Sequence, residues 1–167
     1  YWPLAKELSR LGHKVTILAL HHDYEALRCR ISKREGVEIR YVAQMHVRKV
    51  GSNKYYFSPV RLVGIAVLAT WRLMRAALCV PSDVYHVGKP HPMNGTAAVL
   101  AHYLKGTPIC LDCDDYEAAS NRFVGNWQRK GVALFEDKLP AFAVGVTVNT
   151  RFTFERLRKL GYPADRI

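Results

Sequence analysis

The chain has 167 residues, with 25 lysines and arginines against 14 aspartates and glutamates, so its formal net charge is +11. This is the length of one ordinary domain, and 49% hydrophobic residues with 11 glycines and 8 prolines exclude a disordered, collagen-like or low-complexity protein. Four cysteines are too few for a disulfide scaffold. We therefore expect a packed globular fold in a reducing, cytoplasmic setting.

The first half of the chain alternates between helical and strand patterns. Leucines at helical spacing precede Gly12, which supplies the left-handed residue that ends a helix. Arg61, Arg72 and Arg75 interrupt the longest apolar stretch, whereas a membrane-spanning helix needs about 20 nearly uncharged residues, so we expect a soluble helix there. The expected elements are a helix over 3–11, a strand over 15–20, a polar segment over 24–34, a strand over 37–42 and a helix from Ser58-Pro59 to near Pro81.

The second half repeats this alternation. The expected elements are strands over 83–87, 108–111 and 145–148, and helices over 96–105, 127–142 and 150–160. Strands that alternate with helices imply βαβ units, and hence an α/β fold with one open, doubly wound, Rossmann-like parallel sheet. The prediction is a single domain over 1–167. Because such a domain normally opens on a strand, we expect the chain to lack its first strand and to be truncated at both ends.

Polar residues collect in the loops that follow the predicted strands. In open α/β sheets ligands bind beyond the carboxyl ends of the strands, so a site is expected in these loops. The residues are His21, His22 and Asp23 after the first strand, Lys89, His91 and Asn94 after the third, Asp112, Asp114, Asp115 and Tyr116 after the fourth, and Thr150 and Arg151 after the fifth.

Three of these residues, Asp112, Asp114 and Asp115, crowd their carboxylates at the end of one strand. Like-charge repulsion among them favours a cation or a basic partner. Because side chains alternate along a strand, Asp112 and Asp114 are predicted to share a face, where they could ligate a divalent ion or divide into acid and base. The alternative for each aspartate is a turn or a helix cap.

The predicted helix that starts at Asn94-Gly95-Thr96 offers backbone N–H groups and a positive dipole end beside Lys89 and His91. One interpretation is an anion cradle, and the other is a plain N-cap at Asn94.

Cys110 and Cys113 have C-x-x-C spacing but fall on a predicted strand, and the sequence contains no second close pair. Because structural zinc usually takes four ligands, we expect these cysteines to be buried small hydrophobes. We also expect His86, within the preceding strand, to be a core histidine.

The segment over 44–57 mixes Arg48, Lys49 and Lys54 with aromatic residues and lacks periodicity. It is typical of a loop that dips into a membrane interface or closes over an acceptor, and equally of a solvated connection whose aromatics pack on the core. The sequence has no zinc-finger, helix-turn-helix or RNA-binding signature, so we do not expect a nucleic-acid partner.

Four segments match, in order, the pattern of a known family. They are 4–17, a helix followed by Gly-His-Lys-Val-Thr-Ile; Asp83-Val-Tyr-His-Val87; Gly106-Thr-Pro-Ile-Cys-Leu-Asp112; and Val148-Asn-Thr150 with 161–167. Together they resemble the amino-terminal domain of GT-B glycosyltransferases of family 4. The likeness covers nearly the whole chain.

The resemblance implies the acceptor-side half of a two-domain enzyme that transfers a sugar, with retention, from a nucleotide-diphosphate sugar. It implies that a second Rossmann-like domain holds most of the donor site, that no further cofactor or protein-held metal is needed, and that this chain alone is inactive. Many members place a histidine that contacts the donor sugar after the fourth strand, and counted from Pro108 that position is Asp114, with Asp112 orienting the loop. The candidate substrate-binding residues are Asp115, Tyr116, Lys89, His91, Asn94, Arg122, Thr150 and Arg151.

Two other functions stay open. The strand that ends Asp112-x-Asp114 resembles the nucleophile strand of haloacid-dehalogenase-like phosphohydrolases, although Asp115 stands where threonine or valine is expected. The other is a non-catalytic module that binds a glycan or a lipid phosphate.

Basic residues in the predicted loops also suggest what kind of acceptor and surface the chain meets. Lys89, His91, Arg122 and Arg151 favour an anionic or lipid-linked glycan acceptor. With the net charge of +11, they predict peripheral contact with the inner face of a membrane.

Overall fold

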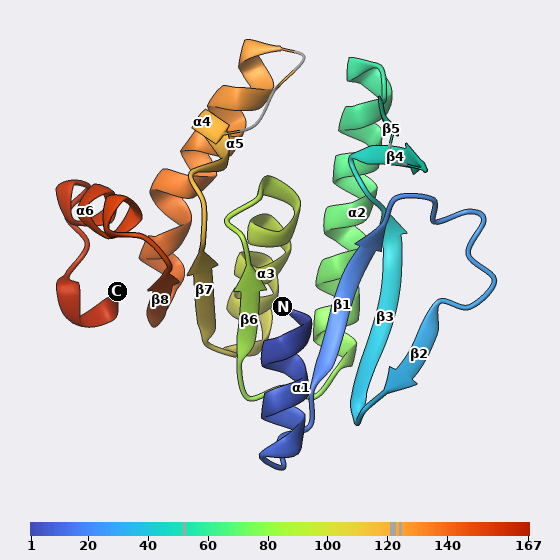
Figure 1. Ribbon diagram of the computed structural model, residues 1–167, viewed down its shortest axis with the longest axis horizontal. Coiled ribbons are helices and arrows are strands. Elements are labelled where there is room, and N and C mark those ends of the chain that lie inside the picture. The colour runs from blue at the N-terminus through green and yellow to red at the C-terminus, as the bar shows by residue number, and fades with distance from the viewer. Residues whose placement is uncertain (52, 121–122, 124) are drawn as a thin grey trace. The chain divides into compact units, whose positions relative to one another are not determined.

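The structure is a computed structural model that describes residues 1–51, 53–120, 123 and 125–167. It is an α/β structure in which the chain folds as two compact units, Tyr1–Val80 and Pro81–Ile167 (Figure 1). They are called the amino-terminal unit and the carboxyl-terminal unit below.

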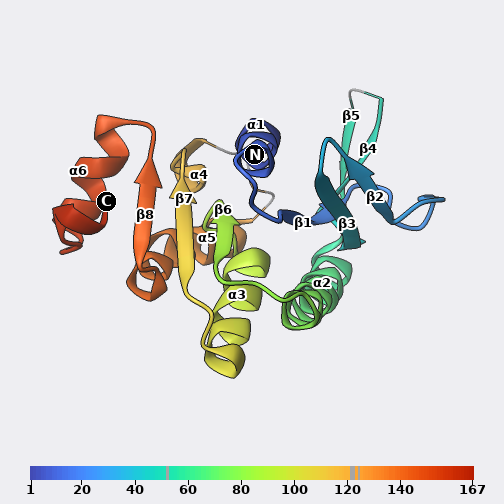
Figure 2. The same ribbon diagram turned by 90° about the horizontal axis from the view of Figure 1, so that it is seen from below.

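The amino-terminal unit contains a three-stranded sheet, two helices and a hairpin. Its elements are α1 (Trp2–Arg10), β1 (Thr16–His21), β2 (Ile31–Arg34), β3 (Val37–Gln44), β4 (Val47–Val50), β5 (Asn53–Tyr56) and α2 (Pro59–Cys79). The central strand β3 pairs in parallel with β1 and antiparallel with β2, and among the described residues β4 and β5 form a separate two-stranded sheet. Figure 2 shows α1 and α2 on opposite faces of the three-stranded sheet, and α2 packs along β3 and β1.

The carboxyl-terminal unit contains a three-stranded parallel sheet with helices packed on it. Its elements are β6 (Tyr85–Gly88), α3 (Pro92–Lys105), β7 (Ile109–Cys113), α4 (Glu117–Ser120), α5 (Asn126–Lys138), η1 (Leu139–Phe142), β8 (Gly145–Val148), α6 (Arg151–Lys159) and η2 (Ala164–Arg166). The strand order is β6-β7-β8, with Leu111 of β7 opposite both Val87 and Val146. The helix α3 packs on β6 and β7 and against α5, and α6 packs on β8 (Figure 2).

The core of the carboxyl-terminal unit explains which way the site residues point. Ile109 and Leu111 of β7 are at most 1% exposed, as is Leu157 of α6. Because side chains alternate along a strand, Cys110 and Asp112 lie on the other, half-buried face of β7. The burial of one face thus fixes the direction of Asp112, the one acidic residue within the strand.

The structure confirms the five predicted strands, which correspond to β1, β3, β6, β7 and β8. The left-handed glycine predicted to end the first helix is also present, at Gly12 with φ 92°, and Gly106 with φ 74° ends α3 in the same way. Short apolar runs for strands and glycines after helical patterns are therefore reliable guides to these elements.

The prediction of one parallel sheet is confirmed only in part. Within the described residues the strands form three hydrogen-bonded sheets, β2 is antiparallel, and the segment predicted as an irregular loop over 44–57 contains the hairpin β4–β5. All four residues of β2 and of β5 are exposed. Exposed strands bury no apolar face, so they lack the hydrophobic alternation on which the prediction depended.

Two local predictions are wrong. The helix predicted to start at Asn94-Gly95-Thr96 begins at Pro92, with His91 as its N-cap, so Asn94 lies inside the first turn. The reason is that proline is favoured in the first turn, where its missing N–H costs nothing. His86 is exposed and not a core residue, because Tyr85 and Val87 on either side take the buried face of β6.

Candidate functional site

The three parallel strands of the carboxyl-terminal unit end at one edge of their sheet, at Gly88, Cys113 and Val148. The loops that follow parallel strands lie at the same edge. A backbone hydrogen bond joins the loop after β6 to the end of β7, since the N–H of Lys89 donates to the carbonyl oxygen of Asp112 at 3.1 Å. This edge therefore brings Lys89 to the acidic residues that follow β7.

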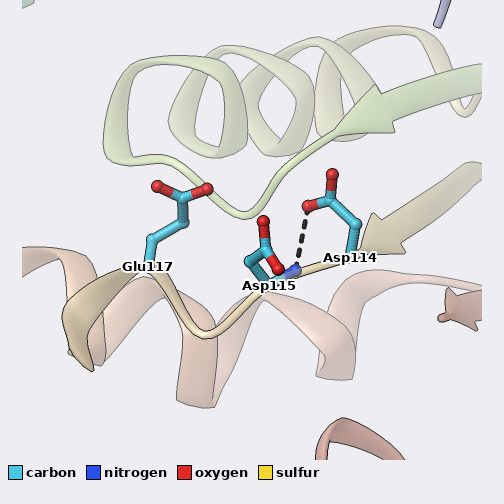
Figure 3. A group of neighbouring side chains, drawn as sticks. All are labelled: Asp114, Asp115 and Glu117. Atoms are coloured by element: carbon cyan, nitrogen blue, oxygen red, sulfur yellow. Dashed lines mark hydrogen bonds between the residues drawn. The ribbon is translucent and has the colours of Figure 1, made fainter. Parts of the chain in front are cut away.

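Lys89 lies among three carboxylates, and we call Lys89, Asp114, Asp115 and Glu117 the Lys89 cluster. The Lys89 Nζ atom is 3.5 Å from Asp114 Oδ1 and 3.8 Å from Asp115 Oδ2, and it donates a hydrogen bond to Glu117 Oε1. One oxygen from each carboxylate lies within 4.8 Å of the others (Figure 3). With three carboxylates around one ammonium, the cluster has an excess of negative charge.

The loop after β6 fixes both the backbone conformation of Lys89 and the protonation of its ammonium. Its φ of 72° is in the left-handed region, which costs a residue with a Cβ about 1–2 kcal/mol. Burial lowers the pKa of Lys89, but the hydrogen bond to Glu117 and the charges of Glu117, Asp114 and Asp115 together outweigh it and raise the pKa above its ordinary value. Lys89 is thus a fixed positive charge.

Asp114 is the member of the cluster best placed to meet a ligand. Its Oδ1 accepts the backbone N–H of Asp115 at 3.0 Å (Figure 3) and also faces Lys89, so the carboxylate is oriented from two sides. Its side chain is 31% exposed. A carboxylate that is oriented and reachable can accept hydrogen bonds from sugar hydroxyls or stabilise a developing positive charge.

Asp114, Asp115 and Glu117 are also the residues that could hold a metal ion, since hard divalent cations prefer carboxylate oxygens. The ammonium of Lys89 already supplies a positive charge to all three. Lys89 therefore offsets part of the negative charge of the cluster without an ion, and we assign the cluster no metal.

A second carboxylate, Glu136 of α5, holds the segment that follows the cluster. Its Oε1 accepts the backbone N–H of Glu117 at 2.5 Å and its Oε2 accepts that of Ala118 at 3.1 Å, which satisfies two N–H groups of the first turn of α4. Glu136 is only 3% exposed. Burial raises its pKa above the ordinary value, although the two backbone hydrogen bonds and Arg156 act in the opposite direction.

A small pocket lies beside the cluster within the carboxyl-terminal unit. It is lined by Pro90, Cys113, Asp115, Tyr116, Glu136, Thr153, Arg156 and Leu157. The Arg156 guanidinium lies over the Tyr116 ring, 4.0 Å from its centroid, and forms an ion pair with Asp137. Tyr116 therefore presents an aromatic wall held by a cation–π contact.

The thiol of Cys113 lines the same pocket and is not a nucleophile. Burial raises its pKa to about 12, and the negative charges of Asp112, Glu136 and Asp114 act in the same direction. The interpretation of Cys113 as a buried small hydrophobe is confirmed, and Cys110 is half-buried. Both are free thiols.

Residues 2–167 match the family model described as the glycosyl transferase 4-like domain. The chain belongs to this family. The resemblance predicted from the four sequence segments is thereby confirmed over essentially the whole chain. Among curated proteins the chain has no match. A glycosyl transferase 4-like domain implies a nucleotide-sugar donor and an acceptor, so family membership decides against the phosphohydrolase alternative.

In this glycosyl transferase 4-like domain, Asp112 and Asp114 do not form the predicted carboxylate pair. Asp112 Oδ1 accepts the hydroxyl hydrogen of Thr147 at 2.7 Å, across the β7–β8 pair, while the neighbours of Asp114 are Lys89 and Asp115. The strand ends between the two aspartates, so alternation no longer fixes the direction of the second side chain.

Four further predicted site residues of the glycosyl transferase 4-like domain have structural partners. Thr150 caps α6, since its hydroxyl oxygen accepts the N–H of Thr153 at 3.1 Å, and Arg151 is 91% exposed and lies 3.8 Å from Glu155. Asn94 donates to the carbonyl oxygen of Gly88 at 3.4 Å, and His91 occupies the N-cap position of α3, where its backbone carbonyl oxygen accepts the N–H of Gly95 at 2.8 Å.

Two remaining groups of predicted residues are not assigned to this site. Arg122 lies outside the described residues. His21 and Asp23 belong to the amino-terminal unit, where the Asp23 N–H donates to His21 Nδ1 at 3.1 Å.

Sequence reasoning missed Glu117, Glu136 and Arg156 in the glycosyl transferase 4-like domain. The sequence could have revealed Glu117, because it lies three residues after Asp114 and extends the acidic run. No sequence feature indicated Glu136 or Arg156. They lie on helices distant in sequence from the acidic run, where they resemble ordinary polar residues. Only the folded structure brings them to Tyr116.

Proposed function

We propose that this domain is the acceptor-side half of a two-domain GT-B glycosyltransferase that transfers a sugar from a nucleotide sugar with retention. The Lys89 cluster is the observation that supports the proposal, because it gathers oriented charged groups at the strand edge where α/β sheets bind ligands. The donor-binding partner in the proposal is a second Rossmann-like domain, and the domain alone is inactive.

Asp114 is the proposed catalytic residue. In the proposed complex its carboxylate accepts a hydrogen bond from a donor-sugar hydroxyl and stabilises the positive charge that develops at the anomeric carbon as the leaving group departs. Asp112 is the proposed positioning residue. Its carbonyl oxygen accepts from Lys89 and its carboxylate accepts from Thr147, so it links the ends of all three strands.

The charge of the Lys89 cluster indicates what kind of acceptor the site would bind. Lys89 is already engaged by three carboxylates, so it offers little to a phosphate. Exposed Asp115 and the ring of Tyr116 are suited to sugar hydroxyls and sugar rings. We therefore favour a glycan acceptor bound through hydroxyl groups, with His91, Asn94, Thr150 and Arg151 outside the immediate cluster.

The test replaces Asp114 in the two-domain enzyme. Asp114→Asn keeps the shape and the hydrogen-bonding oxygen but removes the charge, so we expect turnover to fall by about 10²–10³-fold. Asp83→Asn is the matched control, because Asp83 is exposed at the amino end of β6, the opposite end of the strand from the site. Transfer of radiolabelled sugar to the acceptor is the measurement.

Wild-type turnover in Asp114→Asn would contradict the proposed role. So would an equal loss in Asp83→Asn, because a general loss of fold or charge would then explain the effect. Far-ultraviolet circular dichroism of both variants separates loss of activity from loss of structure.

A further inference from the structure

The helix α2 has an unusual surface for a helix of a folded unit. Among the helices in the described part of the chain, α2 alone is long and apolar enough to cross a membrane, judged by length and composition only. Its most apolar 18-residue window has a mean hydropathy of 1.6, yet only 17% of that window is buried. A helix in the core of a protein would have most of this window buried, whereas most of this window of α2 is exposed or half-buried.

The exposed apolar residues form a continuous stripe along the outer side of α2. Val60, Val63, Val67 and Trp71 recur at helical spacing and are 86%, 52%, 65% and 48% exposed. The inner side is different, since Ala69 and Leu73 are buried and α2 packs along β3 and β1. The apolar stripe therefore faces away from the sheet.

Arginines line one flank of this stripe. Arg61 and Arg72 are 11 residues apart, about three helical turns, so they lie on the same side of the helix, and Arg75 lies close to them. The Arg75 guanidinium is 5.6 Å from the Trp71 ring centroid, and that of Arg61 is 5.0 Å from the Phe57 ring centroid. Apolar stems with charged ends beside aromatic rings are suited to a membrane interface.

The hairpin β4–β5 adds positive charge immediately before α2. Lys49 and Lys54 are directly opposite each other, an arrangement that repels and gains nothing within the fold. Tyr55 and Tyr56, both more than half exposed, follow them. Residues 47–79 contain six lysines and arginines and no aspartate or glutamate.

We propose that the outer face of α2 and the hairpin β4–β5 form a docking surface for an anionic lipid bilayer. This goes beyond the transfer reaction and does not depend on it. Charge of one sign next to an apolar stripe with tryptophan and tyrosine complements anionic headgroups over acyl chains. Because the inner side of α2 packs on the sheet, the helix lies in the plane of the interface and does not cross it.

The test is flotation of the 167-residue chain with lipid vesicles. We expect binding to vesicles of phosphatidylcholine with about one third phosphatidylglycerol, weaker binding to phosphatidylcholine alone, and release by about 0.5 M NaCl. Val67→Asp should lower binding by about tenfold, because it places a charge in the apolar stripe. Lys49→Glu with Lys54→Glu should lower binding to anionic vesicles by a similar factor.

Each variant has a matched control in the carboxyl-terminal unit. Leu104→Asp alters an apolar residue that is 68% exposed on α3, and Arg129→Glu with Lys130→Glu reverses two exposed charges on α5. Both controls should bind like the wild type, and circular dichroism verifies that all variants fold.

Three results would overturn the proposal. They are no preference of the wild type for anionic vesicles, an equal loss in variants and controls, or self-association of the wild type that Val67→Asp abolishes. The last would assign the stripe to contact between copies of the chain. Glycosyl transfer to a soluble acceptor by the two-domain enzyme should be unchanged in Val67→Asp, so failure here is distinguishable from failure of the proposed reaction.

Discussion

At the scale of single residues, Lys89 shows how the fold maintains a charge where a ligand would bind. Its left-handed backbone is unfavourable, and its ammonium is partly removed from water. Three carboxylates compensate, and two of them, Asp114 and Asp115, are themselves candidate ligand contacts. The residue therefore links the stability of the loop to the chemistry of the site.

The raised pKa of Lys89 predicts a pH-dependent stability. A lysine whose pKa is higher in the folded than in the unfolded state stabilises the fold fully below its ordinary value of 10.5, and this contribution is lost as the pH rises through the higher folded value. Wild type should exceed Lys89→Met in free energy of unfolding by about 1 kcal/mol, a small value because the side chain is partly exposed.

Urea unfolding of both proteins from about pH 7 to about pH 11 measures this difference. It should stay constant through neutral pH and shrink above 10.5. A difference that grows over that alkaline range would contradict the account of Lys89.

Cys113 offers an independent check on the site at residue scale. With a pKa of about 12 its thiolate is only about one part in ten thousand of the total at pH 8. We therefore expect iodoacetamide to alkylate exposed Cys29 and Cys79 in the native protein and to spare Cys113, as read by mass spectrometry of peptides. Rapid native alkylation of Cys113 would show that β7 ends in a more open environment than the structure has.

At the scale of elements, the close packing of α3 on α5 supports the edge that holds the site. A Cβ atom at Gly95 would lie 2.9 Å from Leu139 Cδ2 and 3.1 Å from Phe135 Cδ1, and Leu139 is only 2% exposed. Gly95→Ala should therefore destabilise the protein by about 1–3 kcal/mol from overpacking, in spite of alanine's better helix propensity.

Gly131→Ala on α5 is the matched control, because a Cβ atom there would meet nothing within 4 Å. It should stabilise the protein by about 0.5–1 kcal/mol. Urea unfolding of the two variants measures both effects. If Gly95→Ala were as stable as Gly131→Ala, the packing of α3 against α5 would be looser than described.

Comparison of elements shows what the sequence could and could not reveal. The strand over 108–111 and the acidic loop after it were predictable, because one buried and one half-buried face leave an apolar run, and the polar residues follow where that run stops. The hairpin β4–β5 was not, since its lysines and tyrosines are exposed and bury no regular face. Glu136 was not predictable either, because its partners at Glu117 and Ala118 are 19 and 18 residues away.

At the scale of the whole molecule, the two proposed functions, glycosyl transfer and membrane binding, belong to two different surfaces. The carboxyl-terminal unit holds the Lys89 cluster at the strand edge, and the amino-terminal unit holds the apolar and basic face of α2. Family membership supplies the reaction class, and the charge and geometry of the cluster support the residues proposed for it. Neither surface depends on the other for its interpretation.

The central claim is that this domain contributes one half of a glycosyltransferase site and needs a donor-binding domain for catalysis. Release of nucleoside diphosphate from a panel of nucleotide sugars, in the presence of glycan acceptors, tests it most directly. The 167-residue chain should give no release above the protein-free blank, and the enzyme that contains both domains should give turnover that Asp114→Asn lowers by about 10²–10³-fold. Sustained release by the 167-residue chain alone would contradict the claim.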